Sequence, residues 1–465
     1  MSTLFTPEEV LAATGAVCVN PTHPQKVFIG VTTDSRSVKF ANLFVALRGE
    51  RFDGHAFLKQ ASDIGVTGVV VEAGHPRSEL PPEVAIFEVP DTLRALGGLG
   101  RFHRQRFSIP VCAVGGSNGK TTTKEMVAAI LSTRGPALST QGNFNNEIGV
   151  PLTLFRLEPT HVAAVIELGM NHPGEVERLT DIARPQAGVV TVVQPEHLEG
   201  LGSLEGVAHA EGELYRGLPK DGIAVANLDD ALAHAEAKNS GRKLITFGVD
   251  AKADVRMLGI DKHDASGIAF RIGFQGKTLN AAIPHVGEHN AKNACGAFAL
   301  ATALGYTPDE CLRGLAQSAP ANRRLNVKKL PVGATLLDDC YNANPGSMAA
   351  ALDTVASLAR TGRAVAVLGD MLELGAEESD AHRELGEKAA KLPLLVFFGP
   401  RSKLGAEAAK KSGAREVVHT ENPDDAVALL KSKLASGDVV LVKGSRGMRM
   451  ERIVAGLTGE AAGGH

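Results

Sequence analysis

A glycine-rich segment after residue 110 combines residue types that can bind phosphate. The apolar run at 111–114 leads into Gly115-Gly-Ser-Asn-Gly-Lys-Thr-Thr, and a helical pattern continues to about Ser132. Such a turn aims backbone N–H groups and the start of a helix at a phosphate, while the lysine adds charge and a threonine hydroxyl can hold Mg²⁺. We predict a site for nucleoside triphosphate phosphates, comprising Gly116, Ser117, Asn118, Gly119, Lys120, Thr121 and Thr122.

The match to the common phosphate-binding pattern is incomplete. In G-x-x-x-x-G-K-[ST] the first glycine would stand at Val114, so only the shorter form from Gly116 to Thr121 is present. The alternative interpretation is a tight turn that merely connects a strand to a helix. We favour phosphate binding because the match from Gly116 onward is complete.

Two further polar side chains follow the next apolar runs of the chain. The run at 162–166 ends at Glu167, and the run at 189–193 is soon followed by His197. Ligands of doubly wound sheets lie outside the carboxyl ends of the strands, so we expect Lys120, Glu167 and His197 at one edge of one sheet. A carboxylate and an imidazole there can coordinate metal ions that neutralise nucleotide phosphates. Either residue alone would more simply be a solvated loop residue.

Three other loops combine amides, acids or cations. Asn143, Asn145 and Asn146 stand close together and would form either a hydrogen-bonded turn or a site for an oxygen-rich ligand. In the last third of the chain, acids and amides follow a predicted strand at 338–347, and cations follow another at 443–449. Two such loops at strand ends of one domain indicate a binding edge.

The elements that must position these residues alternate along the chain. Short β-branched runs, such as 27–31 and 43–47, alternate with helical patterns, which predicts an α/β fold with parallel sheets. A basic cluster at 101–106 and a proline-containing segment at 319–325 interrupt the pattern. We therefore expect three domains, residues 1–107, 108–322 and 323–465. Residues 267–283 alternate around Gln275-Gly276 and predict a hairpin beside a parallel sheet.

Composition excludes several classes of function. The 465 residues include 49 Lys and Arg and 52 Asp and Glu, a formal charge of −3, so we expect no nucleic-acid partner. Five cysteines without a C-x-x-C spacing argue against a disulfide framework and a zinc site. The first ten residues do not resemble a secretory signal, and no apolar run reaches the ~18 residues of a membrane span. We expect a cytoplasmic monomer without membrane insertion.

The order of the motifs resembles that of the Mur ligases, which use ATP to add amino acids to the peptidoglycan precursor. The shared motifs are the glycine-rich turn, the cluster at 143–151, Glu167 with Gly169 and Asn171, His197-Leu-Glu-Gly, and Gly287-Glu-His-Asn-Ala-Lys-Asn293. Segments at 33–36, 44–55, 339–345, 368–375 and 443–450 are similar to the member that joins D-alanyl-D-alanine to UDP-N-acetylmuramoyl-tripeptide. The resemblance covers residues 33–451.

This resemblance implies three jobs for the three domains. The N-terminal domain would hold the UDP-sugar, a central parallel-sheet, P-loop-like domain would be the ATPase, and a C-terminal Rossmann-like domain would close over the nucleotide. ATP and Mg²⁺ are the implied cofactors, and UDP-N-acetylmuramoyl-tripeptide and D-alanyl-D-alanine are the implied partners. Asn290 and Asn293 would approach adenine, Arg324 the γ-phosphate and Asp339 the ribose. The implied substrate-binding residues are Ser35, Arg36, Asn143, Asn146, Asn344 and Ser347.

One position departs from the family pattern. Many Mur ligases carry a carbamylated lysine whose added carboxylate binds the second Mg²⁺, and Glu211 aligns with that lysine. Our hypothesis is that Glu211 supplies the carboxylate directly; the alternative is a residue that only caps or pairs on a helix surface. The expected catalytic residues are then Lys120, His197 and Glu211, and the expected metal ligands are Thr121, Glu167, His197 and Glu211.

Two alternative functions stay open at this point. One is another ligase of this kind, either the member that adds the third residue or a folylpolyglutamate-type enzyme. The other is a nucleotide switch that hydrolyses ATP to change shape for a protein partner. The loops at 339–344 and 443–450 favour the dipeptide-adding ligase.

Overall fold

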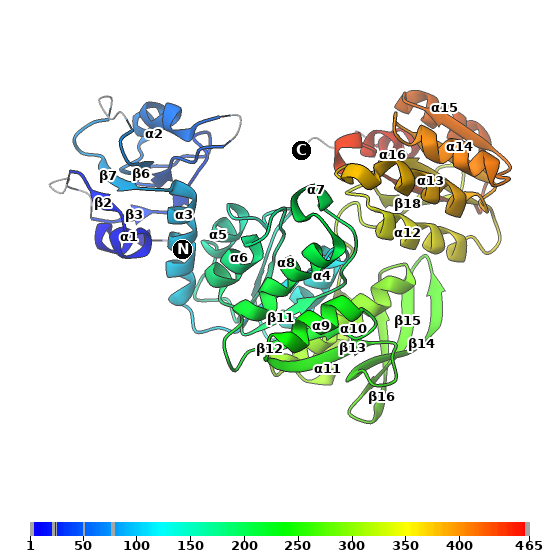
Figure 1. Ribbon diagram of the computed structural model, residues 1–465, viewed down its shortest axis with the longest axis horizontal. Helices are drawn as coiled ribbons and strands as arrows, with labels where there is room; N and C mark the ends of the chain where they lie inside the picture. The colour runs from blue at the N-terminus through cyan, green and yellow to red at the C-terminus, as the bar shows by residue number, and fades with distance from the viewer. Residues whose placement is uncertain (1–3, 21–23, 25, 50–51, 76–79, 461–465) are drawn as a thin grey trace.

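Three lobes, each built around its own sheet, follow one another along the chain (Figure 1). The computed structural model describes residues 4–20, 24, 26–49, 52–75 and 80–460. Glu50 and Arg51, which belong to the motif at 44–55, lie outside these ranges. Within the described ranges, no helix combines the length and the apolar character needed to cross a membrane.

The N-terminal lobe contains a five-stranded sheet with the order β2-β7-β6-β5-β4. Strands β4 to β7 run parallel, and β2 pairs antiparallel with β7. The strand expected at 27–31 is divided in two, because Gly30 adopts a φ of 88° between β3 and β4. The elements are β1 Leu4–Phe5, α1 Pro7–Thr14, β2 Val17–Cys18, β3 Phe28–Ile29, β4 Val31–Thr32, β5 Leu43–Val45, η1 Gly54–Phe57, α2 Leu58–Ile64, β6 Gly68–Glu72, β7 Ala85–Val89 and α3 Thr92–Gln105.

The central lobe contains a nine-stranded sheet with the order β16-β15-β14-β13-β12-β11-β8-β10-β9. Its strands are parallel from β9 to β14, and β14, β15 and β16 are antiparallel. The strands are β8 Val111–Gly115, β9 Ala137–Ser139, β10 Ala163–Glu167, β11 Ala187–Val190, β12 Ile223–Asn227, β13 Lys243–Gly248, β14 Val255–Asp264, β15 Gly267–Phe274 and β16 Lys277–Ile283. The predicted hairpin is confirmed as β15 and β16, and the third antiparallel strand, β14, was not expected.

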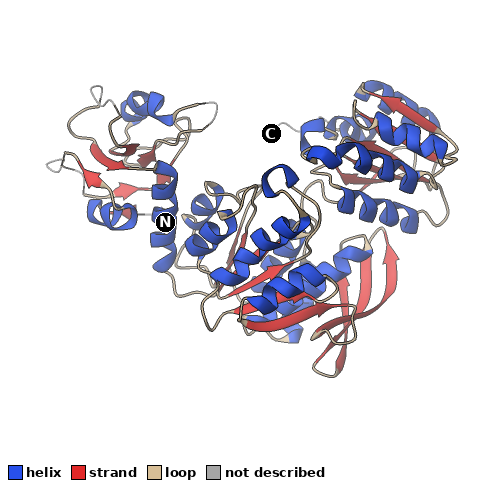
Figure 2. Cartoon of the chain, viewed as in Figure 1, coloured by secondary structure: helices blue, strands red, loops and turns tan. Residues whose placement is uncertain are grey.

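Helices cover both faces of the central sheet (Figure 2), as a parallel sheet with crossover helices requires. Side chains of α4, α10 and α11 fill the core on one face, and those of α5, α6, α8 and α9 fill the core on the other. The helices are α4 Lys120–Leu131, α5 Gly149–Leu154, α6 Glu175–Ala183, α7 Leu198–Leu201, α8 Leu204–Gly217, α9 Ala231–Asn239, α10 Glu288–Ala303 and α11 Pro308–Gln317.

The C-terminal lobe contains a six-stranded sheet with the order β17-β18-β22-β19-β20-β21, in which only β17 is antiparallel to its neighbour. The predicted α/β, Rossmann-like character of this region is confirmed. Its elements are β17 Asn326–Lys329, β18 Thr335–Asp339, α12 Pro345–Leu358, β19 Ala364–Gly369, η2 Gly375–Glu377, α13 Glu378–Ala389, β20 Leu394–Phe398, α14 Lys403–Lys411, β21 Val417–Thr420, α15 Pro423–Lys433, β22 Val439–Lys443, η3 Arg446–Met448 and α16 Glu451–Thr458.

The strand expected at 189–193 was placed too far along the chain. Strand β11 covers Ala187–Val190, and the next three residues form a loop over the glycine-rich turn. The carbonyl of Val192 accepts a hydrogen bond from the Ser117 N–H at 2.7 Å, and the Val193 N–H donates to Asp230 at 2.6 Å. Val192 and Val193 lie outside the sheet because their backbone groups bond to the glycine-rich turn and to Asp230 rather than to a neighbouring strand.

Two linkers join the lobes. The first runs from the end of α3 at Gln105 to the start of β8, and the second runs from the end of α11 at Gln317 to the start of β17. The boundaries expected near residues 107 and 322 fall within these linkers. In the first linker, the Arg106 guanidinium lies 4.7 Å from the centre of the Phe5 ring and pairs with Glu9 at 2.8 Å, so it anchors the start of the linker to the N-terminal lobe.

The central and C-terminal lobes also make direct side-chain contacts. Asn118 and Asn344 exchange two amide hydrogen bonds, each 3.1 Å long. Arg360, just after α12, donates to the carbonyl of His263 on β14 at 2.7 Å. These contacts hold the C-terminal lobe over the carboxyl ends of the central strands.

We predict that Tyr215→Phe destabilises the central lobe by about 1–3 kcal/mol, because two buried backbone groups would lose their partner. The fully buried Tyr215 hydroxyl donates to the Val225 carbonyl at 2.8 Å and accepts from the Val190 N–H at 3.0 Å. Urea titration followed by circular dichroism measures the change. Tyr306→Phe is the matched control, since the Tyr306 hydroxyl makes a single 3.2 Å bond to Leu131. Equal midpoints for the two variants would contradict the prediction.

Candidate active site

The glycine-rich turn has the geometry of an anion cradle. Gly116 and Gly119 adopt φ values of 112° and 83°, and a Cβ at Gly116 would lie 2.3 Å from the Thr191 hydroxyl. A Cβ at Gly119 would lie 2.7 Å from an oxygen of Asn293. Because Gly119 precedes α4 and provides no side-chain cap, the first N–H groups of the helix are left for an anion. The strand, turn and helix expected here are present, and phosphate binding by these residues stays a prediction.

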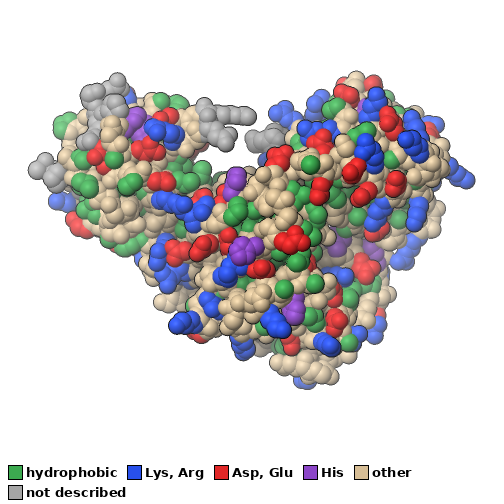
Figure 3. Space-filling view, viewed as in Figure 1, with side chains coloured by type: hydrophobic (Ala, Val, Ile, Leu, Met, Phe, Trp, Pro, Cys, Tyr) green, Lys and Arg blue, Asp and Glu red, His purple; other side chains and the backbone are tan. Residues whose placement is uncertain are grey.

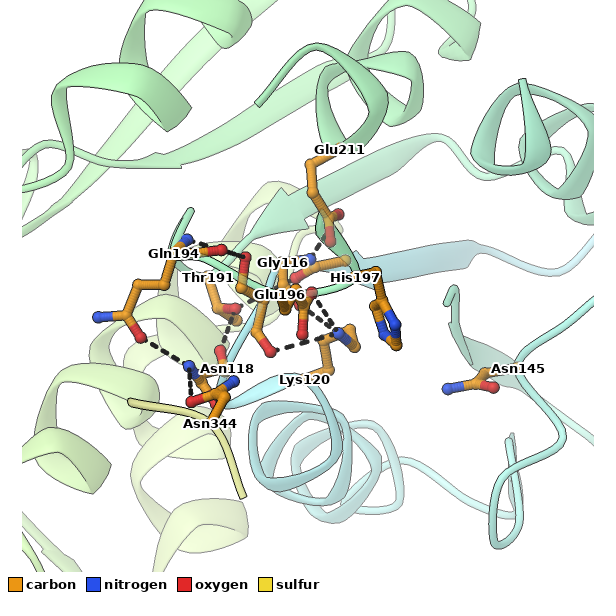
Figure 4. A network of polar contacts seen from close by, with 12 residues as sticks. Gly116, Asn118, Lys120, Asn145, Thr191, Gln194, Glu196, His197, Glu211 and Asn344 are labelled. Carbon is orange, nitrogen blue, oxygen red and sulfur yellow. Dashed lines mark hydrogen bonds and ion pairs between the residues drawn. The ribbon is translucent and has the colours of Figure 1, made fainter. Parts of the chain in front are cut away.

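Neighbouring loops fix the shape of the turn (Figure 4). The Ser117 hydroxyl donates to the Gln194 carbonyl at 3.0 Å and accepts from the Gln194 N–H at 2.9 Å. Thr191 donates to the carbonyl of Asn118 at 2.5 Å. The Asn118 amide also donates to the Gln194 side chain at 2.6 Å. The loop after β11 therefore presets the backbone that would face a phosphate.

Lys120 lies at the centre of a group of carboxylates. Its ammonium group is 3.4 Å from Glu196 and donates to the carbonyl of Gly116 (Figure 4). Burial acts to lower the pKa of Lys120, but the charges of Glu196, Glu211 and Glu167 raise it overall. Burial raises the pKa of Glu196 to about 7 against the opposing effect of Lys120. Lys120 is therefore a retained positive charge beside the phosphate cradle.

Glu167 and Glu211 each present a buried oxygen to this region. One Glu167 oxygen accepts from the Asn145 amide at 2.9 Å, and one Glu211 oxygen accepts from the Gly116 N–H at 2.6 Å. The second oxygen of each carboxylate is buried and has no hydrogen-bond partner among the described residues. Burial also raises the pKa of Glu211, with Lys120 opposing. Buried carboxylate oxygens without partners indicate that a cation completes the site.

These residues fit Mg²⁺, which is bound by one or two carboxylates together with phosphate oxygens and water. Among the residues that the structure describes, no three His, Cys, Asp or Glu side chains form a ready-made metal cage. Thr121 is buried in the first turn of α4. The donors are thus distributed around the cradle, as a metal shared with a nucleotide requires.

His197 lies between two lobes. It precedes α7, and its Nδ1 is 3.3 Å from a carboxylate oxygen of Glu373 in the C-terminal lobe. Burial lowers the pKa of His197, and the charge of Lys120 lowers it further, so the imidazole favours the neutral form that binds metals. The structure brings His197, Lys120 and Glu167 to the wall of one cavity, as expected from the strand order.

A cavity of about 440 Å³ lies between the central and C-terminal lobes, next to the cradle, and is called the nucleotide-sized cavity below. On its wall the Asn293 side-chain amide donates a hydrogen bond to the Asn290 side-chain oxygen at 3.0 Å. Asp339 pairs with Lys443 at 2.7 Å and accepts from the Leu325 N–H at 3.1 Å. The expected ATP-binding residues on this wall are Asn118, Gly119, Thr122, Asn290, Asn293, Arg324 and Asp339.

Two more cavities continue from the first: the second shares wall residues with the first, and the third shares wall residues with the second. The second, of about 270 Å³, shares Arg324 and Asp339 with the nucleotide-sized cavity and adds Lys120 and Glu167. The third, of about 250 Å³, shares His197 with the second and reaches the loops after β18 and β22. The three cavities form a continuous row from the cradle into the C-terminal lobe.

Several expected substrate contacts also have local structural roles. Asn146 accepts from the Gly149 N–H at 2.8 Å and so shapes the start of α5. Asn344 caps α12 by accepting from the Ser347 N–H at 2.8 Å. Asn143 lines both the second and the third cavity. All four residues line the row of cavities, and their contacts with substrate stay a prediction.

Ser35 and Arg36 lie apart from these cavities, in the loop between β4 and β5 of the N-terminal lobe. Arg36 is exposed and pairs with Asp34 at 2.8 Å. Hydrogen bonds from the Arg36 side chain and backbone N–H lower the pKa of the Asp34 carboxyl to about 2. In Figure 3 the N-terminal and C-terminal lobes stand on opposite sides of the central lobe. The expected UDP site and the expected ATP site are thus on different lobes.

Sequence reasoning assigned no individual role to four residues that line or support the candidate site: Asn145, Glu196, His289 and Lys443. Asn145, His289 and Lys443 stood in recognised motifs, and Glu196 immediately precedes His197. Burial lowers the pKa of His289 to about 4, so it faces the nucleotide-sized cavity as a neutral ring.

Family models describe the chain in three consecutive parts. Residues 28–104 match the model "Mur ligase family, catalytic domain", and residues 114–301 match "Mur ligase middle domain". Residues 323–446 match "Mur ligase, glutamate ligase domain". Together the three models account for most of the chain.

Curated relatives are similar over nearly their whole length. The chain is 41% identical to UDP-N-acetylmuramoyl-tripeptide--D-alanyl-D-alanine ligase of Escherichia coli (strain K12), over 92% of this chain and 93% of the relative. It is 37% identical to the protein of the same name from Bacillus subtilis (strain 168), over 94% of this chain and 95% of the relative.

Solved structures agree with these relationships. A crystal structure of MurF from Acinetobacter baumannii superposes with a TM-score of 0.89 at 33% identity, covering 99% of this chain and 100% of that chain. MurF ligase from Thermotoga maritima in complex with ADP superposes with a TM-score of 0.84 at 27% identity, covering 92% and 97%. The three-lobe arrangement is therefore that of known structures.

We predict that Mg²⁺ binding in the presence of ADP does not depend on bicarbonate, because Glu211 already supplies a carboxylate beside the cradle. Calorimetry with and without rigorous bicarbonate removal measures the affinity. Glu211→Gln should weaken Mg²⁺ binding ~10-fold or more, and bicarbonate should not restore it. Glu211→Lys is the matched comparison, since a lysine there could gain a carboxylate only by carbamylation. Wild-type binding that collapses without bicarbonate and returns on its addition would contradict the hypothesis.

Proposed function

This chain belongs to the Mur ligase family, and from that premise we propose that it joins D-alanyl-D-alanine to the terminal carboxylate of UDP-N-acetylmuramoyl-tripeptide. ATP would be converted to ADP and phosphate in the same reaction. The names of the curated relatives support this step of peptidoglycan synthesis. In the geometry, the carrying observation is the continuous row of cavities from the phosphate cradle to the loops after β18 and β22.

We assign one job to each part of the chain. Residues 1–107 would hold the UDP-sugar through Ser35 and Arg36, residues 108–322 would bind and activate ATP, and residues 323–465 would bring the dipeptide and cover the nucleotide. The adenine would lie near Asn290 and Asn293 in the nucleotide-sized cavity. We also propose a cytoplasmic monomer; the free cysteines support the reducing compartment.

Thr121, Glu167, His197 and Glu211 would hold Mg²⁺ ions around the cradle. When bound, Mg²⁺ would neutralise phosphate charge and so help two anions to meet. The two partnerless carboxylate oxygens of Glu167 and Glu211 support this assignment.

The first step requires the tripeptide carboxylate to approach a γ-phosphate of the same charge sign. Lys120 would lower this repulsion, because its carboxylate neighbours keep it protonated. Arg324, on the wall of both the first and the second cavity, would add positive charge at the γ-phosphate. The step gives an acyl phosphate and ADP.

In the second step the amine of the dipeptide attacks the acyl phosphate, and phosphate leaves. Water would hydrolyse the acyl phosphate, so the site must be covered. The C-terminal lobe contributes Asp339 and Asn344 to cavities beside the cradle. We assign the third cavity to the dipeptide and call it the acceptor pocket. Because the C-terminal lobe both covers the nucleotide and lines this pocket, it can exclude water and position the dipeptide at the same time.

We expect repeated turnover of ATP to ADP to require both UDP-N-acetylmuramoyl-tripeptide and D-alanyl-D-alanine, because without the dipeptide the reaction stops at the acyl phosphate. A coupled ADP-release assay with each substrate omitted in turn measures this requirement, and parallel assays with tripeptides ending in diaminopimelate or lysine identify the accepted third residue. A folylpolyglutamate-type ligase would show no response to the muramoyl substrate. ATP turnover without either substrate would defeat the proposal and favour a nucleotide switch.

Lys120→Ala should abolish acyl phosphate formation while leaving UDP-sugar binding nearly unchanged, because the expected UDP site is on a different lobe. Hydroxylamine trapping measures the acyl phosphate, and calorimetry measures UDP-sugar binding. Arg36→Ala is the complementary variant, which should weaken UDP-sugar binding and spare nucleotide binding. Lost UDP-sugar binding in Lys120→Ala would contradict the division of labour among the lobes.

A further inference from the structure

Tyr341 lies beneath two arginine side chains that come from distant parts of the sequence. The guanidinium carbon of Arg324 is 4.4 Å from the centre of the Tyr341 ring, and that of Arg446 is 5.3 Å from it. Tyr341 follows β18 and Arg446 follows β22. Because β18 and β22 are neighbouring parallel strands, their carboxyl ends bring these residues to one edge of the C-terminal sheet.

These two arginines differ from the other stacked arginines of the described chain. Arg106, over Phe5, also pairs with Glu9 at 2.8 Å, and Arg134, over Tyr306, also pairs with Glu310 at 2.7 Å. Within the described ranges, neither Arg324 nor Arg446 has a carboxylate within ion-pair distance. Their positive charge is therefore offset by the negative face of the ring and is left for anionic ligands.

The ring stands between two cavities. Tyr341 lines both the second and the third cavity, whereas Arg324 lines the first and the second. Arg446 lines the third and, among the described residues of that wall, is the only lysine or arginine. One aromatic side chain thus separates a cation on the nucleotide side from a cation on the side of the acceptor pocket.

We propose that Tyr341 is a positioning residue that aims Arg324 at the γ-phosphate of ATP and Arg446 at the carboxylate of the acceptor dipeptide. The inference rests on the proposed function, which supplies the two anions. A guanidinium binds a carboxylate through two parallel hydrogen bonds and therefore needs a fixed plane. Stacking on the ring fixes the plane of each guanidinium without a carboxylate that would compete for it. Tyr341 thus orients one arginine for each half-reaction.

Steady-state kinetics of Tyr341→Leu and Tyr341→Phe test the role of the ring. We expect Tyr341→Leu to lower kcat/KM for both ATP and the dipeptide by ~5- to 30-fold, while KM for UDP-N-acetylmuramoyl-tripeptide stays unchanged. Tyr341→Phe keeps the ring and should therefore keep most of the wild-type kcat/KM for both substrates. Equal losses in the two variants would overturn the stacking role, and so would a Tyr341→Leu enzyme that matches the wild type.

The half-reactions separate the two arginines. Arg446→Ala should raise KM for the dipeptide yet still form the acyl phosphate, as measured by hydroxylamine trapping without dipeptide. Tyr341→Leu should slow acyl phosphate formation as well. Toward the dipeptide, the double variant should lose no more than Arg446→Ala alone, since the ring acts there through the arginine. Additive losses, or unimpaired trapping in Tyr341→Leu, would overturn the proposal.

A folding control and a wild-type control complete the design. Tyr306→Leu removes the ring under Arg134, 3.8 Å from the guanidinium carbon and away from the cavities, so it should lower thermal stability without changing any KM. If it reproduces the selective KM changes of Tyr341→Leu, those changes reflect folding and the positioning role is overturned. Failure of the wild type to require both substrates defeats the proposed function instead, so the two failures are distinguishable.

Discussion

The site depends on the attraction between Lys120 and the carboxylates around it. Lys120 is largely buried, and these carboxylates keep its ammonium group charged. Burial alone would lower the pKa of Lys120, and the charges of Glu196, Glu211 and Glu167 reverse that effect. The dependence is mutual, since Lys120 opposes the rise in the pKa of Glu196 and Glu211. An anion that takes Lys120 as its partner leaves these carboxylates in need of another cation. In the proposed reaction, nucleotide and metal therefore complete one charge balance.

Parallel sheets determine where this balance can exist. The carboxyl ends of β8, β10 and β11 supply the cradle, Glu167 and the loop with His197, while the ends of β18 and β22 supply Asp339 and Lys443. Two such edges face each other across the contact of Asn118 with Asn344. A single edge leaves its ligand open to water on one side, whereas two opposed edges can surround a nucleotide and exclude water.

The parts of the fold that the sequence could predict are those with a local signal. Apolar runs followed by glycine or polar residues located β8 and β10, and the Gln275-Gly276 turn located the hairpin. The strand expected at 189–193 was wrong because Val192 and Val193 are apolar residues of a loop, held by hydrogen bonds to Ser117 and Asp230. Strand β14 escaped notice because exposed residues such as Lys262 obscure its alternation and its pairing with β15 contains register shifts.

In the candidate site, too, the residues with a local sequence signal could be predicted and the others could not. Lys120, Glu167 and His197 were found because each lies at or after the carboxyl end of a strand of one sheet, so a rule about strand ends was enough to bring them together. The partners of these residues depend on contacts between distant segments. Asn145 reaches Glu167 from a separate loop, and Glu211 reaches the Gly116 N–H from the middle of α8. A sequence pattern can state that a residue faces an edge, but the identity of the atom opposite it follows only from the packing of whole elements.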